Sequence, residues 1–184
     1  GIAMPLAKGT LYDPGIKIPL IVAWNGRVRG GQRSKALTSN VDLLPTILDA
    51  IGENERIPQG LDGYSLWPCV EHGKDVAHQY IFAEQTWHDF YEPMRAIRSK
   101  QYKLIHNFEP GVGMQIAADI LHSPTVNVMR ETLRNWPRPE IEFYDLIEDP
   151  GERHNLAGSP EILDIERALT RELDDWLVRT ADPI

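Results

Sequence analysis

The chain has 184 residues, a formal net charge of −8 and a single cysteine, Cys69. The acidic balance argues against nonspecific nucleic-acid binding, which depends on clustered lysines and arginines that neutralise phosphates. One cysteine excludes an intrachain disulfide and a multi-thiolate zinc site, and no apolar run reaches the roughly 20 residues that cross a bilayer. We therefore expect neither a nucleic-acid partner nor a membrane partner.

The first predicted elements are a strand and a helix. Residues 18–24, IPLIVAW, form a short apolar run, which is typical of a strand buried on both faces of a parallel sheet. Residues 39–52 predict a helix with Ser39 or Asp42 as its N-cap, and Pro45 favours Asp42 because proline fits only the first turn. A strand, a turn and a helix in this order predict an α/β fold class, as the last strand-helix unit of a larger sheet.

A loop-like stretch follows this helix. Residues 56–73 contain three glycines and two prolines, a composition that predicts a loop. We place the boundary between two domains near Lys74. Residues 1–73 would form the end of an α/β domain, and residues 74–184 a second, smaller domain.

Four segments of the second domain are short, rich in aromatic or β-branched residues and partly alternating, which predicts strands. They are residues 80–84, 94–99, 102–108 and 142–146. Only Lys100 and Gln101 separate the second segment from the third, so these two are predicted to form a hairpin. Together the segments predict a small, four-stranded antiparallel sheet.

Two helices are predicted beside this sheet. Residues 123–136 begin with Ser123 as the cap and a proline at the first helical position. Residues 159–180 begin in the same way, with Ser159 and Pro160. Apolar side chains then recur at steps of three and four, at Ile162, Ile165, Leu169, Leu173 and Trp176. This stripe predicts a C-terminal helix that covers one face of the sheet, which makes the second domain α+β.

Lys8 is the first candidate for chemistry. It lies between Ala7 and Gly9, shortly before the turn Asp13-Pro14-Gly15, so its ammonium can be held near an anion beside backbone amides. A solvated surface lysine is the more common case, because most lysines are exposed. The spacing alone does not make a site.

The segment Trp87-His88-Asp89-Phe90-Tyr91 lies between two predicted strands, where loops often carry binding residues. His88 can donate to a hydroxyl or act near neutral pH. Arg95 can hold a sulfate or carboxylate with two parallel N–H bonds, and the alternation along its strand allows it to face a cleft between the domains. The alternative is an edge loop with a buried tryptophan and ordinary surface charges.

Other polar residues predict structure rather than chemistry. The acidic run at residues 145–152 lacks the tight oxygen spacing of a calcium loop and predicts a solvated turn. His106 is predicted to be a core histidine with its hydrogen bonds satisfied, and His154 has no partner at zinc spacing. Cys69 has apolar neighbours and only His72 as a nearby cation, which is not the environment of a reactive thiolate.

Several stretches, taken in order, resemble a known enzyme family. K-G-T-L-Y-D-P-G-I-K-I-P-L-I-V, S-N-V-D-L-L-P-T-I-L-D-A-I-G and G-L-D-G-Y-S-L-W-P resemble the later part of the catalytic domain of sulfatases, in the alkaline-phosphatase-like superfamily. The closing F-Y-D-L-I-E-D-P-G-E-R-H-N-L-A is similar to the signature of the sulfatase C-terminal subdomain. Within the family, three features resemble the heparan N-sulfatase (sulfamidase) type: P-M-R-A-I-R with Y-K-L-I-H-N in the hairpin, S-P-T at the start of the helix at residues 123–136, and D-W-L-V-R-T-A-D-P.

The resemblance implies cofactors that other residues would supply. Sulfatases carry a calcium ion and a formylglycine, which is made from the cysteine or serine of a C-x-P-x-R motif. Cys69 is followed by Val70-Glu71-His72 and does not match this motif. The glycine of the family's metal-binding segment matches Gly1, so the metal ligands would lie immediately before the first residue of this chain and none within it.

The resemblance also implies roles for four side chains. Lys8 matches the lysine of the family's G-K-x-T segment, which contacts the sulfate group. In the sulfamidase type an arginine takes this place, so the choice between N-sulfate and O-sulfate stays open. We expect His88 and Arg95 to help form the pocket that selects the sugar, with Asp182 at its rim.

We therefore expect the C-terminal part of a sulfatase that hydrolyses sulfate esters or N-sulfates of a glycosaminoglycan-type sugar. Two alternatives stay open: a phosphodiesterase or phosphonate hydrolase of the same superfamily, and a noncatalytic glycan-binding subdomain. The family is compatible with a bacterial periplasmic or secreted location, or a lysosomal one in a eukaryote.

The expected partners are the remainder of the catalytic domain and a sulfated saccharide, and a homodimer is allowed. We expect the chain alone to be inactive. We also expect it to be poorly stable or aggregated, because the strand at residues 18–24 would leave backbone groups unpaired and an apolar face in water.

Overall fold

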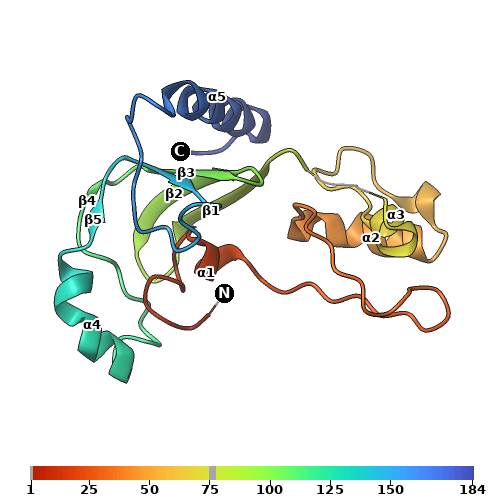
Figure 1. The fold of residues 1–184 in the computed structure, drawn as a ribbon, viewed down its shortest axis with the longest axis horizontal. Helices are drawn as coiled ribbons and strands as arrows, with labels where there is room; N and C mark the ends of the chain where they lie inside the picture. Colours follow the sequence, from red (N-terminus) through yellow and green to blue (C-terminus); the bar gives the residue numbers. More distant parts are fainter. Residues whose placement is uncertain (1, 75–77) are drawn as a thin grey trace. The chain divides into compact units, whose positions relative to one another are not determined.

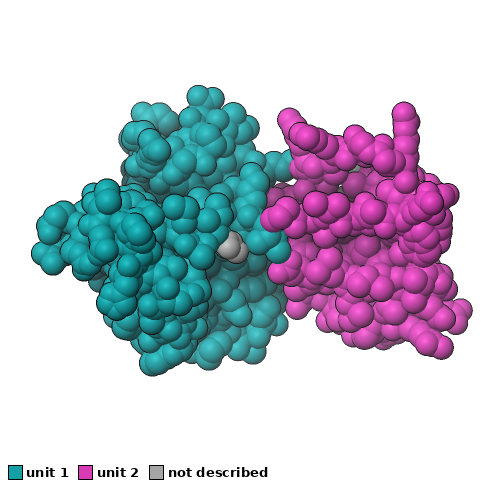
Figure 2. All heavy atoms as spheres, turned by 90° about the horizontal axis from the view of Figure 1, so that it is seen from below, with its two compact units in different colours: residues 1–18, 82–184 teal, residues 19–81 magenta. Residues whose placement is uncertain are grey.

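The computed structural model describes residues 2–74 and 78–184, so Gly1 lies outside the described part. The described residues form two compact units, which Figure 2 shows in two colours. Unit 1 combines the N-terminal segment up to Ile18 with Phe82–Ile184, and unit 2 is Pro19–Ile81. The predicted domains, residues 1–73 and 74–184, stay a prediction.

The elements follow one another along the chain as Figure 1 labels them. They are α1 (Asp13–Ile16), η1 (Asn40–Asp42), α2 (Leu43–Ala50), η2 (Asn54–Arg56), α3 (Trp67–His72), β1 (Ile81–Trp87), β2 (Tyr91–Arg98), β3 (Tyr102–Asn107), β4 (Gly111–Val112), α4 (Pro124–Arg134), β5 (Pro137–Arg138), β6 (Ile141–Asp145) and α5 (Leu163–Thr180). None of the helices in the described ranges is long and apolar enough to cross a membrane.

A four-stranded sheet in the order β1-β2-β3-β6 forms the core of unit 1. β2 and β3 pair antiparallel, with Arg95 opposite His106, and β6 pairs antiparallel with the other edge of β3. Residues 99–101 join β2 to β3, and the N–H of Ser99 donates to the carbonyl of Tyr102 across 2.8 Å. The predicted antiparallel sheet and its hairpin are therefore confirmed.

Helix α5 lies across β2 and β3 on one face of this sheet (Figure 1). Leu169 and Leu173 are buried, and the ring of Trp176 stacks on Phe82 with a centroid distance of 4.8 Å. The apolar stripe read from the sequence therefore covers the sheet as predicted.

The starts of the two long helices of unit 1 differ in how well they were predicted. The hydroxyl of Ser123 accepts a backbone N–H in the first turn of α4, as expected for a cap. Helix α5 begins at Leu163 rather than at Pro160. The reason is that the N–H of Ile162 donates to the carbonyl of Ser159 and closes a separate turn before the helix.

The N-terminal segment covers the other face of the sheet. Leu11 and Tyr12 are buried there in one cluster with Met94 and Ala96 of β2. Because side chains alternate along a strand, these two positions of β2 share a face. The chain that carries Lys8 is thereby fixed to the sheet of unit 1.

Asp42 links three segments of unit 2. Its side chain is fully buried, accepts from the N–H groups of Ser39 and Tyr64, and lies 2.7 Å from Nε2 of His78. The prediction that Asp42 caps the helix is wrong for its side chain, which makes no cap bond to α2. The carboxylate instead holds the start of that helix against two later parts of the chain.

Residues 18–24, predicted as a buried strand, form no strand in the structure. Their apolar side chains are exposed, with Ile21 at 87%. A strand is stable only where its N–H and C=O groups find partners, and no strand of the described ranges lies beside this segment. The predicted strand at residues 18–24 is therefore wrong.

Helix α3 and the strands β4 and β5 were not predicted. Residues 56–73 contain the short helix α3, in which Trp67 is buried and Pro68 lies in the first turn. Gly73 ends this helix with a φ of +67°, a conformation that glycine adopts at little cost. In the long connection between β3 and β6, the strands β4 and β5 form a separate two-stranded sheet.

Candidate functional site

A hollow lies beside the turn between β1 and β2 in unit 1. Three segments meet around it: the chain after Lys8, the turn that carries His88, and the residues that lead into α4. Its lining includes Gly9, Gln85, His88, Asp89, Phe90 and Gln115. Because these segments come from distant parts of the sequence, the hollow exists only in the folded unit.

A backbone turn holds Lys8 immediately before Gly9, which lines this hollow. The N–H of Lys8 donates to the carbonyl of Met4 across 3.0 Å. Gly9 follows with a φ of +73°, in the left-handed region that glycine enters readily. The side chain of Gln85 then donates to the carbonyl of Gly9 across 3.2 Å, which ties the turn to β1.

Asp119 is the ion-pair partner of Lys8. The ammonium of Lys8 donates to the carboxylate of Asp119, and 29% of the Lys8 side chain stays exposed. This hydrogen bond lowers the pKa of Asp119, and the charges of Lys8 and His88 lower it further. Sequence patterns do not single out Asp119, because it lies 111 positions from its partner in an irregular segment.

His88 stands in the turn between β1 and β2. Nδ1 of its ring lies 3.3 Å from the carboxylate of Asp89, and its backbone N–H donates to the carbonyl of Phe90. Asp89 in turn accepts from the N–H of Ala118 across 2.6 Å, which links the turn to the segment before α4. His88 and Gly9, the residue after Lys8, therefore line the same hollow, while contact of His88 and Lys8 with a saccharide stays a prediction.

Arg95 and Asp182 contact each other and are not part of the hollow's lining. Nε and Nη2 of Arg95 donate to the two carboxylate oxygens of Asp182 across 2.7 and 2.9 Å. The other N–H groups donate to the carbonyls of Gln85 and Met94 and to the hydroxyl of Thr86. Only 1% and 2% of the two side chains are exposed. Their predicted contact with a saccharide stays a prediction, and for Arg95 it would require one of these bonds to open.

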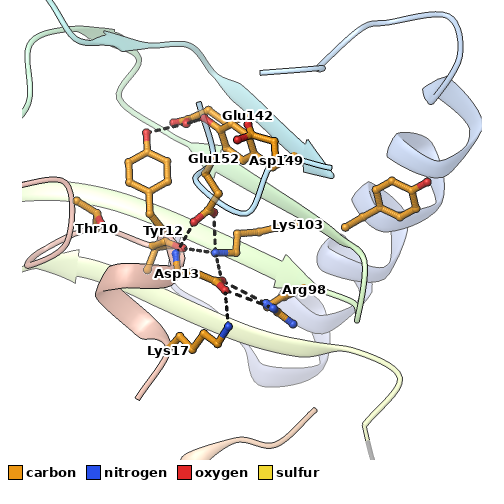
Figure 3. Close-up of polar contacts among 12 residues, drawn as sticks. Thr10, Tyr12, Asp13, Lys17, Arg98, Lys103, Glu142, Asp149 and Glu152 are labelled. Atoms are coloured by element: carbon orange, nitrogen blue, oxygen red, sulfur yellow. Dashed lines mark hydrogen bonds and ion pairs between the residues drawn. The ribbon is translucent and has the colours of Figure 1, made fainter. Parts of the chain in front are cut away.

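A buried ion network fixes the N-terminal segment to the sheet, as Figure 3 shows. The ammonium of Lys103, on β3, lies 2.7 Å from the carboxylates of both Asp13 and Glu152. Burial raises the pKa of Asp13, but Lys103 and Arg98 outweigh this effect and hold it at about 2. The solvated turn predicted at residues 145–152 is therefore wrong for Glu152, which is only 3% exposed.

The described residues offer no metal site. Within residues 2–74 and 78–184, no group of three or more histidines, cysteines or carboxylates is arranged to hold a metal ion. The residues present thus do not fit a calcium ion, and the expectation about ligands before Gly1 concerns residues outside the described part.

Cys69 and His106 occupy other places in the fold. Cys69 lies on α3 in unit 2, where its thiol is 3.6 Å from the hydroxyl of Ser34. His106 is half-buried on β3 and stacks on Phe108 with a centroid distance of 4.0 Å. Neither residue is in the lining of the hollow.

Comparison with known proteins gives one consistent family. The family model described as N-sulphoglucosamine sulphohydrolase, C-terminal, matches residues 6–124. An ulvan-active sulfatase of Formosa agariphila is 31% identical over 183 residues, which cover 95% of this chain and 36% of the relative. The human N-sulphoglucosamine sulphohydrolase is 31% identical over 208 residues, which cover 100% of this chain and 41% of the relative.

A solved structure has the same fold as most of the chain. It is that of a 2-O GAG sulfatase, with a TM-score of 0.58 and 28% sequence identity, covering 82% of this chain and 27% of the other. The chain spans about two fifths or less of the length of the curated relatives described above, 36% and 41% respectively.

Proposed function

The chain belongs to the sulfatase family, and on this premise we propose that it is the C-terminal part of an enzyme that hydrolyses sulfate groups on a sugar. The observation that carries the proposal is the position of Lys8. By the resemblance this residue corresponds to the family's sulfate-contacting lysine; its ammonium contacts Asp119, and the next residue, Gly9, lines the hollow that also contains His88. A cation next to a hollow with polar groups is suited to hold an anionic substituent of a larger ligand.

We propose a sulfated saccharide of the glycosaminoglycan type as the substrate. This proposal is supported by the proteins to which the chain is similar, which include an N-sulphoglucosamine sulphohydrolase and a 2-O GAG sulfatase. These names include both an N-sulfatase and an O-sulfatase, so the proposal covers sulfate esters and N-sulfates alike. A phosphodiesterase or phosphonate hydrolase is not favoured, because the proteins that match are sulfatases.

In this proposal the candidate site residues have different roles. The Lys8 ammonium binds the sulfate oxygens and holds the group in place as charge shifts toward the leaving group of the sugar. His88 donates to a sugar hydroxyl from the rim of the hollow. Arg95 and Asp182 support the end of β1, from which the turn of His88 starts.

The remainder of the enzyme would supply the other groups. The described residues do not fit a metal ion, and Cys69 is not in the sequence context of a formylglycine. We therefore propose that the calcium ion and the formylglycine nucleophile expected for the family belong to the rest of the catalytic domain. When present, this pair would supply the attack on sulfur and the binding of its oxygens.

Replacement of Lys8 in the complete sulfatase tests the proposal. Lys8→Ala should lower kcat/KM for a sulfated sugar by about a hundredfold or more, as expected when a cation that holds the reacting sulfate group is lost. The melting temperature should hardly change, because the ammonium is partly exposed and makes an ion pair at the surface.

Lys17→Ala is the matched control. The side chain of Lys17 is 71% exposed and pairs with Asp13 at 3.6 Å. Lys17→Ala therefore also removes an exposed cation and its ion pair from the N-terminal segment. It should leave kcat/KM unchanged. Turnover by Lys8→Ala within a fewfold of the unmodified enzyme would remove this residue from the mechanism.

A further inference from the structure

The ammonium that would hold the sulfate group already has an anion beside it. The Asp119 carboxylate accepts a hydrogen bond from Lys8, and the two side chains keep 57% and 29% of their exposure. Two anions that need the same donor of a single ammonium compete for it. A sulfate group can reach Lys8 only if it shares the ammonium with Asp119 or displaces it.

The surroundings hold Asp119 in place. The N–H of the preceding residue, Ala118, donates to Asp89 across 2.6 Å, and this bond fixes the segment before α4 against the turn of His88. Asp119 is therefore attached to the two other segments that meet at the hollow, rather than to a free loop.

We propose that Asp119 is a specificity-determining residue whose carboxylate competes with sulfate for the Lys8 ammonium. This inference rests on the proposed function, since it requires that Lys8 holds the sulfate group. As a consequence, Asp119 weakens the retention of released sulfate. It also disfavours a sugar that carries a second anionic group close to the first, because like charges at short distance repel.

The size of the effect follows from the exposure of the pair. Water weakens an exposed ion pair, so removal of the Asp119 charge should tighten sulfate binding by only roughly two- to fivefold. The neutral isostere Asp119→Asn removes the charge and keeps the shape. The melting temperature of Asp119→Asn should stay nearly constant, because an exposed ion pair contributes little to stability.

Equilibrium binding of inorganic sulfate to the complete sulfatase tests the inference without requiring turnover. Titration calorimetry should give a Kd for Asp119→Asn that is roughly two to five times lower than that of the unmodified enzyme. Asp174→Asn makes the same change of charge at an exposed position on α5 and should leave the Kd unchanged. In the Lys8→Ala background, Asp119→Asn should have no further effect.

Sulfate binding and turnover together separate failure of this inference from failure of the proposed function. If Asp119→Asn binds sulfate like the unmodified enzyme while Lys8→Ala has lost turnover, competition by Asp119 is ruled out and the proposed function stands. If Lys8→Ala keeps full turnover, both proposals fail. An equal gain in Asp174→Asn, or a gain that persists in the Lys8→Ala background, would mean a general charge effect and would also overturn the inference.

Discussion

At the scale of single residues, Arg95 uses every hydrogen-bond donor of its guanidinium within the protein. The hydrogen bond from Arg95 lowers the pKa of Asp182, although burial acts in the opposite direction. A buried ion pair contributes little net stability when both partners are present, but removal of one partner leaves an uncompensated charge. The pair therefore fixes the C-terminal Asp182 to the carbonyl and hydroxyl groups at the end of β1.

Arg95→Ala should destabilise the complete enzyme by about 3–5 kcal/mol, because Asp182 is left buried without a cation. Urea unfolding measures the change. Arg167→Ala is the control: it removes an arginine that is 61% exposed and pairs loosely at 3.9 Å, and it should cost less than about 0.5 kcal/mol.

A double replacement separates loss of the ion pair from loss of packing. Arg95→Met combined with Asp182→Leu should recover much of the stability lost in Arg95→Ala, since neither charge is then left alone. Equal stability of Arg95→Ala and the unmodified enzyme would show that the pair does not hold this part of the fold.

Single residues are also where sequence reasoning was least complete. Lys8 and His88 were identified because a family motif or a loop between strands marked them. Asp119 and Glu152 were not, because their partners Lys8 and Lys103 lie 111 and 49 positions away. Ion pairs between residues so far apart leave no local sequence pattern. An acidic run is therefore predicted to be solvated, and only the structure reveals a cation such as Lys103 beside it.

At the scale of elements, the Lys103 network connects α1 and β3 with the turn that follows β6. Asp13 at the start of α1 and Glu152 in that turn share the one ammonium, and Arg98 of β2 lies 3.3 Å from Asp13. Burial raises the pKa of Glu152 more than Lys103 lowers it, so the two carboxylates shift in opposite directions. The network positions the N-terminal segment from which the turn of Lys8 starts.

The depressed pKa of Asp13 predicts a dependence of stability on pH. Its pKa of about 2 lies below the ordinary 3.8, so its contribution of roughly 2 kcal/mol is fully present above pH 4 and is lost as the pH falls toward 2. The difference in unfolding free energy between the unmodified enzyme and Asp13→Asn should therefore shrink over this range. A difference that stays constant from about pH 5 to pH 2 would contradict the assignment.

Elements with a strong local pattern were predicted well. The alternation at residues 94–99 and 102–108 gave the hairpin of β2 and β3, and the stripe at residues 162–176 gave α5. The strands β4 and β5 have two residues each, which is too short for a period to be visible. Residues 18–24 have the composition of a strand but no neighbouring strand in the described ranges, and composition alone does not supply hydrogen-bond partners.

At the scale of the whole molecule, unit 2 exposes several large apolar side chains. Ile21, Ile47 and Ile51 are 87%, 58% and 57% exposed, and Leu20 is 49% exposed. Such exposure is typical of surfaces that another part of a protein covers. We propose that the remainder of the catalytic domain is this cover, and the aggregation of the isolated chain stays a prediction that rests on the same side chains.

The family could be predicted because several motifs occur in the order in which sulfatases have them, and the family match over residues 6–124 confirms the resemblance. The chemistry of the site could be predicted only in part. Lys8 belongs to one of those motifs, whereas Asp119 lies in the long connection between β3 and β6, outside the Ser123-Pro124-Thr125 motif of that connection.

The most direct test of the central claim is a crystal structure of the complete sulfatase with a sugar that carries a nonhydrolysable sulfonate in place of sulfate. We expect a sulfonate oxygen at hydrogen-bond distance, about 3 Å, from Nζ of Lys8, with the sugar in the hollow beside His88. A sulfonate held entirely by other residues, with the Lys8 side chain pointing away from it, would rule out Lys8 as the sulfate contact.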